Sequence, residues 1–517
     1  MLREGGAEHS PARSGKVGAP VPRNLLIRAE KKLTTTSQAY KDNNMRKISA
    51  HSDSSLAGSA KYESDLITNA PNLITVSKFG MVKSVPYHVN RCSSSTSEIR
   101  MDLDRLPNSV IEEILGRLPI QDAVRTSLLS RSWRHRWQST PRLAFNETSF
   151  PPRLGESDLE YKCRLAKAVD RALLLHTSPI SEFRLSCTDL ENWVDVDVWL
   201  QVLSRKGVGS VGLCFCQGFP YKLPSYLFEC ELLGRMELYS CDLKLPETFK
   251  GFRHLVALHL ERLIVSGADL RRLISGCPIL EELQLSQCRG FDVTICAPKL
   301  RKLTVGGCFM YLHLKHTPVL AAASICLSAL SGLHAVIGGY GLAELCSAAP
   351  QIENLVIGGH FLTLLSAIGH IPERLPHALS RLKNLTIDLN FEDLKECEAT
   401  LCLLRSCCSL QILKINHQHR PYALADTGVE AELVWEARKG LDEFDKLTAV
   451  EITRVACLGS AIAFMRFVVA AAANLVRLDV GLDKKVLDDD SKFKEVAKDL
   501  FMSCPRASGQ GRIVLLD

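Results

Sequence analysis

A few short motifs in the sequence have the residue types and spacing of chemical sites. Gly207, Gly209 and Gly212 are spaced as GxGxxG, a pattern that lets a backbone approach a phosphate closely. In nucleotide-binding folds a strand precedes these glycines and a helix follows them, so that the phosphate meets a helix N-terminus. Here an apolar helical pattern at residues 198–202 comes first and a strand-like LCFC follows. The order is reversed, and we predict no nucleotide site.

The nineteen cysteines and the histidine pair His417-x-His419 do not form a metal-binding pattern. A structural zinc site needs four thiols or imidazoles at short paired spacing, which residues 214–216 and 407–408 do not supply. The histidine pair beside Arg420 favours a solvated loop. The sequence contains no P-loop, HExxH or GxSxG motif. We therefore expect no metal, no cofactor and no catalytic residue.

The most regular elements lie between residues 106 and 137, LPNSVIEEILGRLPIQDAVRTSLLSRSWRHRW. Asn108 or Ser109 can cap a helix at its start. Apolar residues then recur at helical spacing over residues 110–118. Pro119 forces the residue before it out of the helical region, so the first helix is expected to end there.

Two further helices are predicted in this segment. Asp122 favours a second helix N-terminus through its negative charge. The apolar side of this helix is expected to consist of Ala123, Val124, Ser127 and Leu128. Trp133 and Trp137, four residues apart, are expected on one face of a third helix. A unit of about forty residues cannot bury so much apolar surface by itself, so we expect it to dock on a partner.

This segment resembles an F-box. The matching residues are Leu106, Pro107, Ile114, Leu115, Leu118, Pro119, Asp122, Ala123, Val124, Arg125, Thr126, Leu129, Ser130, Trp133, Arg134 and Trp137. In that family the three-helix motif binds the Skp-family adaptor of a cullin-RING ubiquitin ligase. The resemblance implies adaptor contacts at Leu106, Pro107, Ile111, Ile114, Leu115, Leu118, Pro119, Val124, Leu128, Trp133 and Trp137. A helical hairpin packed only on its own domain is the alternative, and the two tryptophans are equally well explained as core residues.

Composition and charge place the chain among globular proteins of more than one domain. It has 517 residues, 46% hydrophobic and 23% charged, with a net charge of +6. Residues 1–100 hold +7 of this charge and the remainder −1, so the folded part gives no indication of nucleic-acid binding. The first hundred residues are polar, without a sustained apolar period, and are predicted to form a disordered basic tail. An odd number of scattered cysteines with no secretory leader favours a reducing compartment, the nucleus or the cytoplasm.

An L-x-x-L-x-L unit recurs along the rest of the chain. Its instances start at Ile180, Val208, Leu233, Leu255, Leu280, Leu300, Leu320, Ile352, Leu382, Leu410, Leu447 and Leu475. Steps of about 20 to 37 residues predict an irregular leucine-rich solenoid of parallel strands and helices, an α/β fold. Cys241, Cys288 and Cys308 share one position in the repeat and are expected to be small buried packing residues. The uncharged stretch 319–343 is expected to be a buried strand and helix of the solenoid, not a membrane span.

Residues 432–480 predict a strand, a helix and a strand, and resemble an FBD module. Together with the F-box and the repeats, they give the chain a resemblance to the plant F-box/FBD/leucine-rich-repeat family. The predicted division is a tail (1–100), an F-box (101–147), a helical linker (148–179), a leucine-rich-repeat solenoid (180–430), an FBD-like module (431–482) and a C-terminal helix and tail (483–517). In the linker, an amphipathic helix is predicted between Glu156 and His176.

The resemblance implies a non-catalytic subunit of a ubiquitin ligase, whose F-box holds the adaptor and, through it, the cullin, while the repeats hold a protein substrate. An adaptor-binding scaffold without a role in degradation is the alternative. An enzyme or a nucleic-acid binder would need convergent titratable groups or a basic stripe, which the sequence does not show. Outward side chains of the repeat strands are candidate substrate contacts: Arg235, Glu237, His259, Glu282, Gln284, Arg301, Lys302, Asn354, Lys383 and Lys414. Their mixed charge indicates no substrate class.

Overall fold

The computed structural model describes residues 108–147, 149–187, 195–215, 220–328, 347–366, 371–418, 433–435, 444–455, 458–483 and 512–516. The chain divides into two units, residues 1–88 and 89–517, and every described residue belongs to the second. The predicted tail, Leu106, Pro107 and most of the uncharged stretch 319–343 lie outside the described residues.

The first two helices form where the sequence predicts them. Helix α2 (Asn108–Arg117) begins directly after Pro107, and α3 (Ile120–Arg125) begins after Pro119, with Asp122 in its first turn. The predicted third helix is wrong. Residues 131–135 form turns between two short 3₁₀ helices, η2 (Thr126–Leu128) and η3 (Arg136–Ser139). Local polar contacts, such as the 2.7 Å hydrogen bond between Ser130 Oγ and Ser132 Oγ, compete here with a regular helix.

A strand begins two residues after each of the twelve predicted repeat starts. The twelve strands are β2 (Glu182–Cys187), β3 (Ser210–Phe215), β5 (Arg235–Tyr239), β7 (Ala257–Glu261), β9 (Glu282–Cys296), β10 (Lys302–Lys315), β11 (Ala322–Leu327), β12 (Asn354–Gly359), β13 (Asn384–Leu389), β14 (Ile412–His417), β15 (Ala449–Val455) and β16 (Arg477–Leu482). Each pairs in parallel with the next along this series. The predicted α/β solenoid is therefore confirmed.

Two strands extend the sheet beyond the predicted repeats. Strand β1 (Arg142–Phe145) pairs with β2, and β17 (Arg512–Leu516) pairs with β16. Strand β17 corrects the sequence prediction, which placed a helix and a tail over residues 483–517. Residues 484–511 of that segment lie outside the described residues. A short aliphatic run such as RIVLL does not by itself distinguish a strand from a tail. Short strands β4 (Tyr221–Lys222), β6 (Cys241–Leu243) and β8 (Ile264–Val265) form a second ladder that reaches β9.

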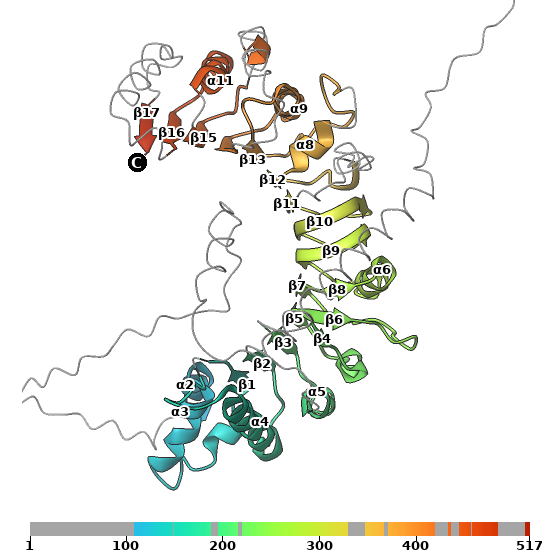
Figure 1. The fold of residues 1–517 in the computed structure, drawn as a ribbon, viewed down its shortest axis with the longest axis vertical. Helices are drawn as coiled ribbons and strands as arrows, with labels where there is room; N and C mark the ends of the chain where they lie inside the picture. The colour runs from blue at the N-terminus through green and yellow to red at the C-terminus, as the bar shows by residue number, and fades with distance from the viewer. Residues whose placement is uncertain are drawn as a thin grey trace, which may run out of the picture. The chain divides into compact units, whose positions relative to one another are not determined.

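Helices lie on one side of the parallel sheet (Figure 1). They are α4 (Asp158–Leu175), α5 (Asp195–Arg205), α6 (Gly267–Ser275), α8 (Phe361–Ser366), α9 (Leu394–Arg405) and α11 (Leu458–Ala471), with the 3₁₀ helix η4 (Ser225–Glu229). Helix α4 is the helix predicted between Glu156 and His176, and a capping box of Ser157 and Glu160 fixes its start. Leu165, Val169 and Leu173 face the core, whereas Leu159 and Cys163 are exposed.

The core runs between the sheet and these helices. Alternate residues of each strand point inward, as in the pair Leu283 and Leu285, which are fully buried. Each such side chain contributes about 1.5–3 kcal/mol by leaving water. Cys241 and Cys288 are buried as predicted, and the side chain of Cys308 lies outside the described residues.

A left-handed backbone position recurs at the same place in six of the repeats. It falls five residues after the first strand residue each time, at Ser240, Arg262, Gln287, Gly307, Gly359 and Arg454, with φ between 52° and 142°. Such φ values favour glycine because it has no Cβ. Backbone space is also short at two of these corners. A Cβ on Gly307 would lie 2.7 Å from the Cys288 carbonyl oxygen, and one on Gly359 would meet the Leu327 carbonyl oxygen.

We predict that Gly307→Ala lowers the free energy of unfolding by about 1–3 kcal/mol, through strain at the positive φ and the backbone clash. Gly306→Ala is the matched control, because its Cβ would meet only the Cys326 carbonyl oxygen at an ordinary 3.7 Å. Urea unfolding followed by circular dichroism measures both. Equal stability of the two variants would contradict the steric account.

Candidate functional site

Helix α2 carries two rows of apolar side chains, one buried and one exposed. Ile111 and Leu115, four residues apart, are each 1% exposed and belong to the core. Val110, Ile114 and Leu118 are also spaced four residues apart and form a neighbouring row. Their side chains are 41%, 39% and 38% exposed. The second row is therefore an apolar stripe that the described part of the chain does not cover.

Further apolar side chains are exposed just after this helix. Val124 on α3 is 39% exposed, while Leu128 and Leu129 are 87% and 60% exposed. We call these six residues, Val110, Ile114, Leu118, Val124, Leu128 and Leu129, the apolar surface. So many large exposed side chains in twenty residues are typical of an interaction site and not of an ordinary surface.

The structure divides the predicted adaptor contacts into two groups. Ile111, Leu115, Trp133 and Trp137 are buried and have a core role, whereas Ile114, Leu118, Pro119, Val124 and Leu128 are exposed. The prediction that Ala123, Val124 and Leu128 share one apolar side of α3 is wrong. Ala123 faces the core, whereas Val124 and Leu128 face outward. Leu106 and Pro107 lie outside the described residues.

Val110 and Leu129 belong to the apolar surface, although neither was among the predicted contacts. Val110 lies one turn before Ile114, and this spacing was a signal that could have identified it. Leu129 matched the F-box pattern but had no helical period to indicate its exposure.

Polar contacts hold the turn beneath the apolar surface in place. Arg136 Nη1 donates to Asn108 Oδ1 at 2.8 Å and so ties η3 to the start of α2. The guanidinium of Arg136 also lies 5.9 Å from the ring centre of Trp133, within cation–π range. These contacts orient the buried tryptophan without a third helix.

Buried contacts join this segment to the first repeats. The ring Nε2 of His176 lies 2.8 Å from the Thr140 carbonyl oxygen, and the Thr177 amide donates to the Gln138 carbonyl at 3.0 Å. Burial lowers the pKa of His176, which favours a neutral ring that donates through Nε2. Lys206 Nζ donates to the His176 carbonyl at 2.8 Å. Together with the β1–β2 ladder, these bonds fix the apolar surface to the sheet.

The outward face of the sheet brings the candidate substrate contacts together as ion pairs. Arg184 on β2 reaches Glu237 on β5, with Nη1 and Oε2 3.2 Å apart, although β3 lies between them. The residue of β3 in register with both is Gly212. The third glycine of GxGxxG therefore leaves room for a salt bridge across two strand spacings.

The same network continues through His259. His259 Nδ1 lies 3.9 Å from Glu237 Oε1, and its Nε2 lies 3.5 Å from Glu282 Oε1. Burial lowers the pKa of His259 despite these carboxylates, so the ring is neutral at pH 7. Lys302 Nζ is 2.8 Å from Glu282 Oε1, and Arg235 Nη1 is 3.6 Å from Glu237 Oε1. The charges of this face are largely neutralised within the chain.

The remaining candidates follow the same pattern. Asn354 Oδ1 accepts a hydrogen bond from Asn384 on the neighbouring strand at 2.6 Å. Three cations each pair with a carboxylate, Arg301 with Glu281 at 3.8 Å, Lys383 with Glu353 at 3.0 Å and Lys414 with Glu451 at 2.6 Å. Gln284 is buried and donates to Ser286 Oγ at 3.3 Å. Among the described residues of this face, no surplus of positive or negative charge indicates the charge of a substrate.

Among the described residues, no three His, Cys, Asp or Glu side chains meet as metal ligands would. The described cysteines are free thiols, and burial raises the pKa of Cys230 to about 12 and of Cys288 to about 11, which makes them poor nucleophiles at pH 7. The predicted solvated loop at His417 is wrong: His417 ends β14, is buried and stacks on Phe391, 5.6 Å between ring centres. Residue 419 lies outside the described residues.

No helix in the described ranges combines the length and apolarity needed to cross a bilayer.

Comparisons with known proteins agree with this architecture. Residues 103–144 match the model of the F-box domain, and residues 196–415 match a model described as the LRR repeats of the FBD-associated F-box protein At5g56370. The F-box/FBD/LRR-repeat protein At1g13570 of Arabidopsis thaliana is 32% identical over 423 residues, which cover 80% of this chain and 97% of that protein. The F-box/FBD/LRR-repeat protein At5g56420 of the same plant is 32% identical over 211 residues, 39% of this chain and 48% of that protein.

The helical segment with its apolar surface and the parallel repeat sheet thus define an F-box protein with leucine-rich repeats. The chain belongs to the plant F-box/FBD/LRR-repeat family.

The two rows of α2 predict different effects of truncation. Ile111→Ala removes a core side chain and should lower the free energy of local unfolding of α2 by about 2–5 kcal/mol. Ile114→Ala, the matched control on the exposed row, should change it by about 0.5 kcal/mol or less. Hydrogen exchange of the α2 amides measures both. Similar protection in the two variants would contradict the assignment of the rows.

The bridge across β3 should stabilise the sheet more than an exposed pair does. A double-mutant cycle on Arg184→Ala and Glu237→Ala is expected to give a coupling of about 1 kcal/mol, because both side chains are less than one-third exposed. The same cycle on Lys414 and Glu451 should give about 0.5 kcal/mol or less, since that pair is more exposed. Urea unfolding provides the free energies, and a larger coupling at the second pair would contradict this ranking.

Proposed function

We propose that this chain is the substrate-recognition subunit of a Skp-cullin-F-box ubiquitin ligase. The observation that carries the proposal is the exposed row of α2, which the described residues leave uncovered although the neighbouring row is packed in the core. An apolar stripe of this kind is stabilised when a partner removes it from water, at roughly 25 cal/mol per Å². A Skp-family adaptor is the partner that F-box domains generally bind.

The proposed adaptor contacts are the exposed members of the predicted set together with the residues outside the described ranges. They are Leu106, Pro107, Ile114, Leu118, Pro119, Val124 and Leu128, with Val110 and Leu129 added from their exposure. Ile111, Leu115, Trp133 and Trp137 act on the adaptor only by holding this surface in shape.

The repeat sheet is proposed to hold a protein substrate at a defined distance from the adaptor. The hydrogen bonds of His176 and Thr177 and the β1–β2 ladder connect the two regions without a described flexible joint. A fixed spacing raises the effective concentration of substrate lysines near the ubiquitin-charged enzyme, and this chain needs no catalytic residue of its own for that role. The proposal includes a location in the nucleus, the cytoplasm or both, which the free thiols of the described cysteines support.

Replacing Ile114 and Leu118 together by Asp is expected to weaken binding of a purified Skp-family adaptor at least about 100-fold, because two charges would enter an apolar interface. Calorimetric titration measures the affinity. The matched control is Leu232→Asp with Val476→Asp, two exposed apolar residues of the repeats, which should leave adaptor binding unchanged. Unchanged binding by the α2 variant would exclude this docking surface.

Expression of the α2 variant in plant cells separates a substrate receptor from a scaffold. A receptor predicts that one or more bound proteins lose ubiquitin and accumulate when the adaptor is no longer recruited. If adaptor binding is lost but no bound protein changes in abundance, the scaffold without a role in degradation is the better description.

A further inference from the structure

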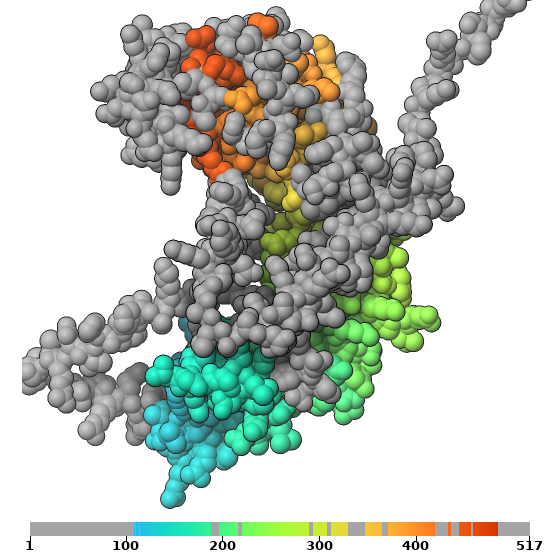
Figure 2. Space-filling model, viewed as in Figure 1, coloured from blue at the N-terminus to red at the C-terminus, as the bar shows by residue number. Residues whose placement is uncertain are grey.

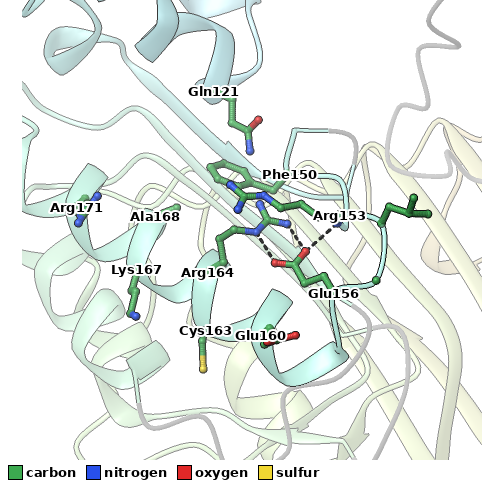
Figure 3. A pocket seen from close by; sticks show the side chains of 12 residues that line it. Gln121, Phe150, Arg153, Glu156, Glu160, Cys163, Arg164, Lys167, Ala168 and Arg171 are labelled. Carbon is green, nitrogen blue, oxygen red and sulfur yellow. Dashed lines mark hydrogen bonds and ion pairs between the residues drawn. The ribbon is translucent and has the colours of Figure 1, made fainter.

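An open groove of about 760 Å³ lies where the segment after α3 meets α4 (Figure 3). One wall is a single face of α4, from Glu160 to Arg171, and the other is formed by residues 150–156. Gln121 of α3 completes the lining at one end. Figure 2 shows the α2–α3 segment and α4 side by side at the same end of the repeats. None of the substrate candidates on the sheet lies in this groove.

Four cationic and two acidic side chains line the groove, and both acids are already engaged. Glu156 accepts hydrogen bonds from Arg164 at 2.7 and 2.8 Å, and these bonds hold the pKa of Glu156 at about 2. Glu160 accepts from the Ser157 amide at 2.9 Å in the capping box of α4. Both carboxylates are therefore charged and bonded at pH 7. The capping box already satisfies the backbone at the start of α4, so an anion in this groove would be bound by the cationic side chains and not by the helix N-terminus.

The cations that remain are Arg153, Lys167 and Arg171. Among the described residues, none of these three side chains forms a hydrogen bond or an ion pair, and two positive charges are left in excess over the acids of the groove. Lys167 and Arg171 project from successive turns of α4, about 6 Å apart along the helix (Figure 3). Apolar groups alternate with these charges. Leu154 is fully exposed, whereas Phe150 on the same wall is buried and Ala168 on α4 is half-buried.

We propose that this groove binds an extended acidic peptide segment of a protein partner. The wall of α4 between residues 160 and 171 is about 16 Å long, which is the span of about five residues of extended chain. Carboxylates of such a segment would pair with Arg153, Lys167 and Arg171, and an apolar side chain of the segment would cover the exposed Leu154. The groove is open to solvent, so a polypeptide can enter and leave it, whereas an enclosed cavity would suit a small molecule.

The groove lies next to the apolar surface, but the proposed peptide binding does not require an adaptor on that surface. Gln121, in the groove, lies one helical turn before Val124 of the apolar surface on α3. A partner bound in the groove therefore sits beside the F-box. The inference goes beyond the proposed ligase role, since the groove can bind an acidic segment whether or not an adaptor is recruited.

Fluorescence anisotropy of the full-length chain with a labelled peptide of alternating Glu and Leu tests the proposal. We expect saturable binding that weakens between 0.05 and 0.5 M salt, because the contacts are exposed charge pairs. Lys167→Glu with Arg171→Glu should weaken binding at least about tenfold, and Lys167→Gln with Arg171→Gln should give a smaller loss, since it removes attraction without adding repulsion. Circular dichroism confirms that the variants fold.

The matched control is Arg381→Glu with Lys395→Glu, which changes the net charge equally at exposed positions of the repeats far along the chain. Intact binding by this control and by the Ile114→Asp, Leu118→Asp variant supports the proposal and keeps it separate from adaptor docking. Three results overturn it: no saturable binding, an equal loss in the control pair, or displacement of the peptide by millimolar inorganic phosphate, which would identify a small-anion site.

Discussion

The stacking of inward aliphatic side chains along one parallel ladder is the interaction on which the rest of the structure depends. Leu258, Leu283 and Leu303 stand in register on successive strands, and the same row continues through Leu355 and Leu385. No repeat buries its own apolar face, so each is stable only between neighbours. The repeat also places a left-handed backbone position five residues after the first strand residue in six of the repeats. A continuous core from Ile111 to Leu482 is the result.

The same constraint explains why the apolar surface lies beside the first strands of the sheet. Strand β1 adds to the ladder directly after the F-box helices, and the carbonyls of Gln138 and Thr140 are bonded by the chain that leads into β2. One row of α2 can then enter the core. The other row stays exposed, because none of the described residues packs over it. The F-box is in this sense the last layer of the solenoid.

Charges on the two sides of the molecule behave differently for a geometric reason. On the sheet, side chains of neighbouring strands stand about 4.8 Å apart, so opposite charges at the same register position pair with one another, as Lys302 does with Glu282. Beside α4, cations one turn apart on a helix have no strand opposite them, and the groove retains positive charge. Arg235, Glu237 and His259 therefore contact one another on the sheet, whereas Lys167 and Arg171 lie on α4, outside the pattern of the repeat strands.

The sequence by itself determined the repeat strands, because their inward positions repeat with period two and their spacing marks each turn; all twelve begin where that pattern places them. It also located α2 and α3, through Pro107 and Pro119. Only the tertiary structure decided which apolar residues of the F-box are core, since Ile111 and Ile114 are equivalent in type and differ only in the direction in which the packed helix turns them. The tertiary structure also decided that Trp133 lies in a turn and that residues 512–516 form a strand. It placed Gly212 between Arg184 and Glu237, where it leaves room for their ion pair. Each of these features depends on residues distant in the chain. Local pattern fixes the period of an element, and packing fixes which of its faces is covered.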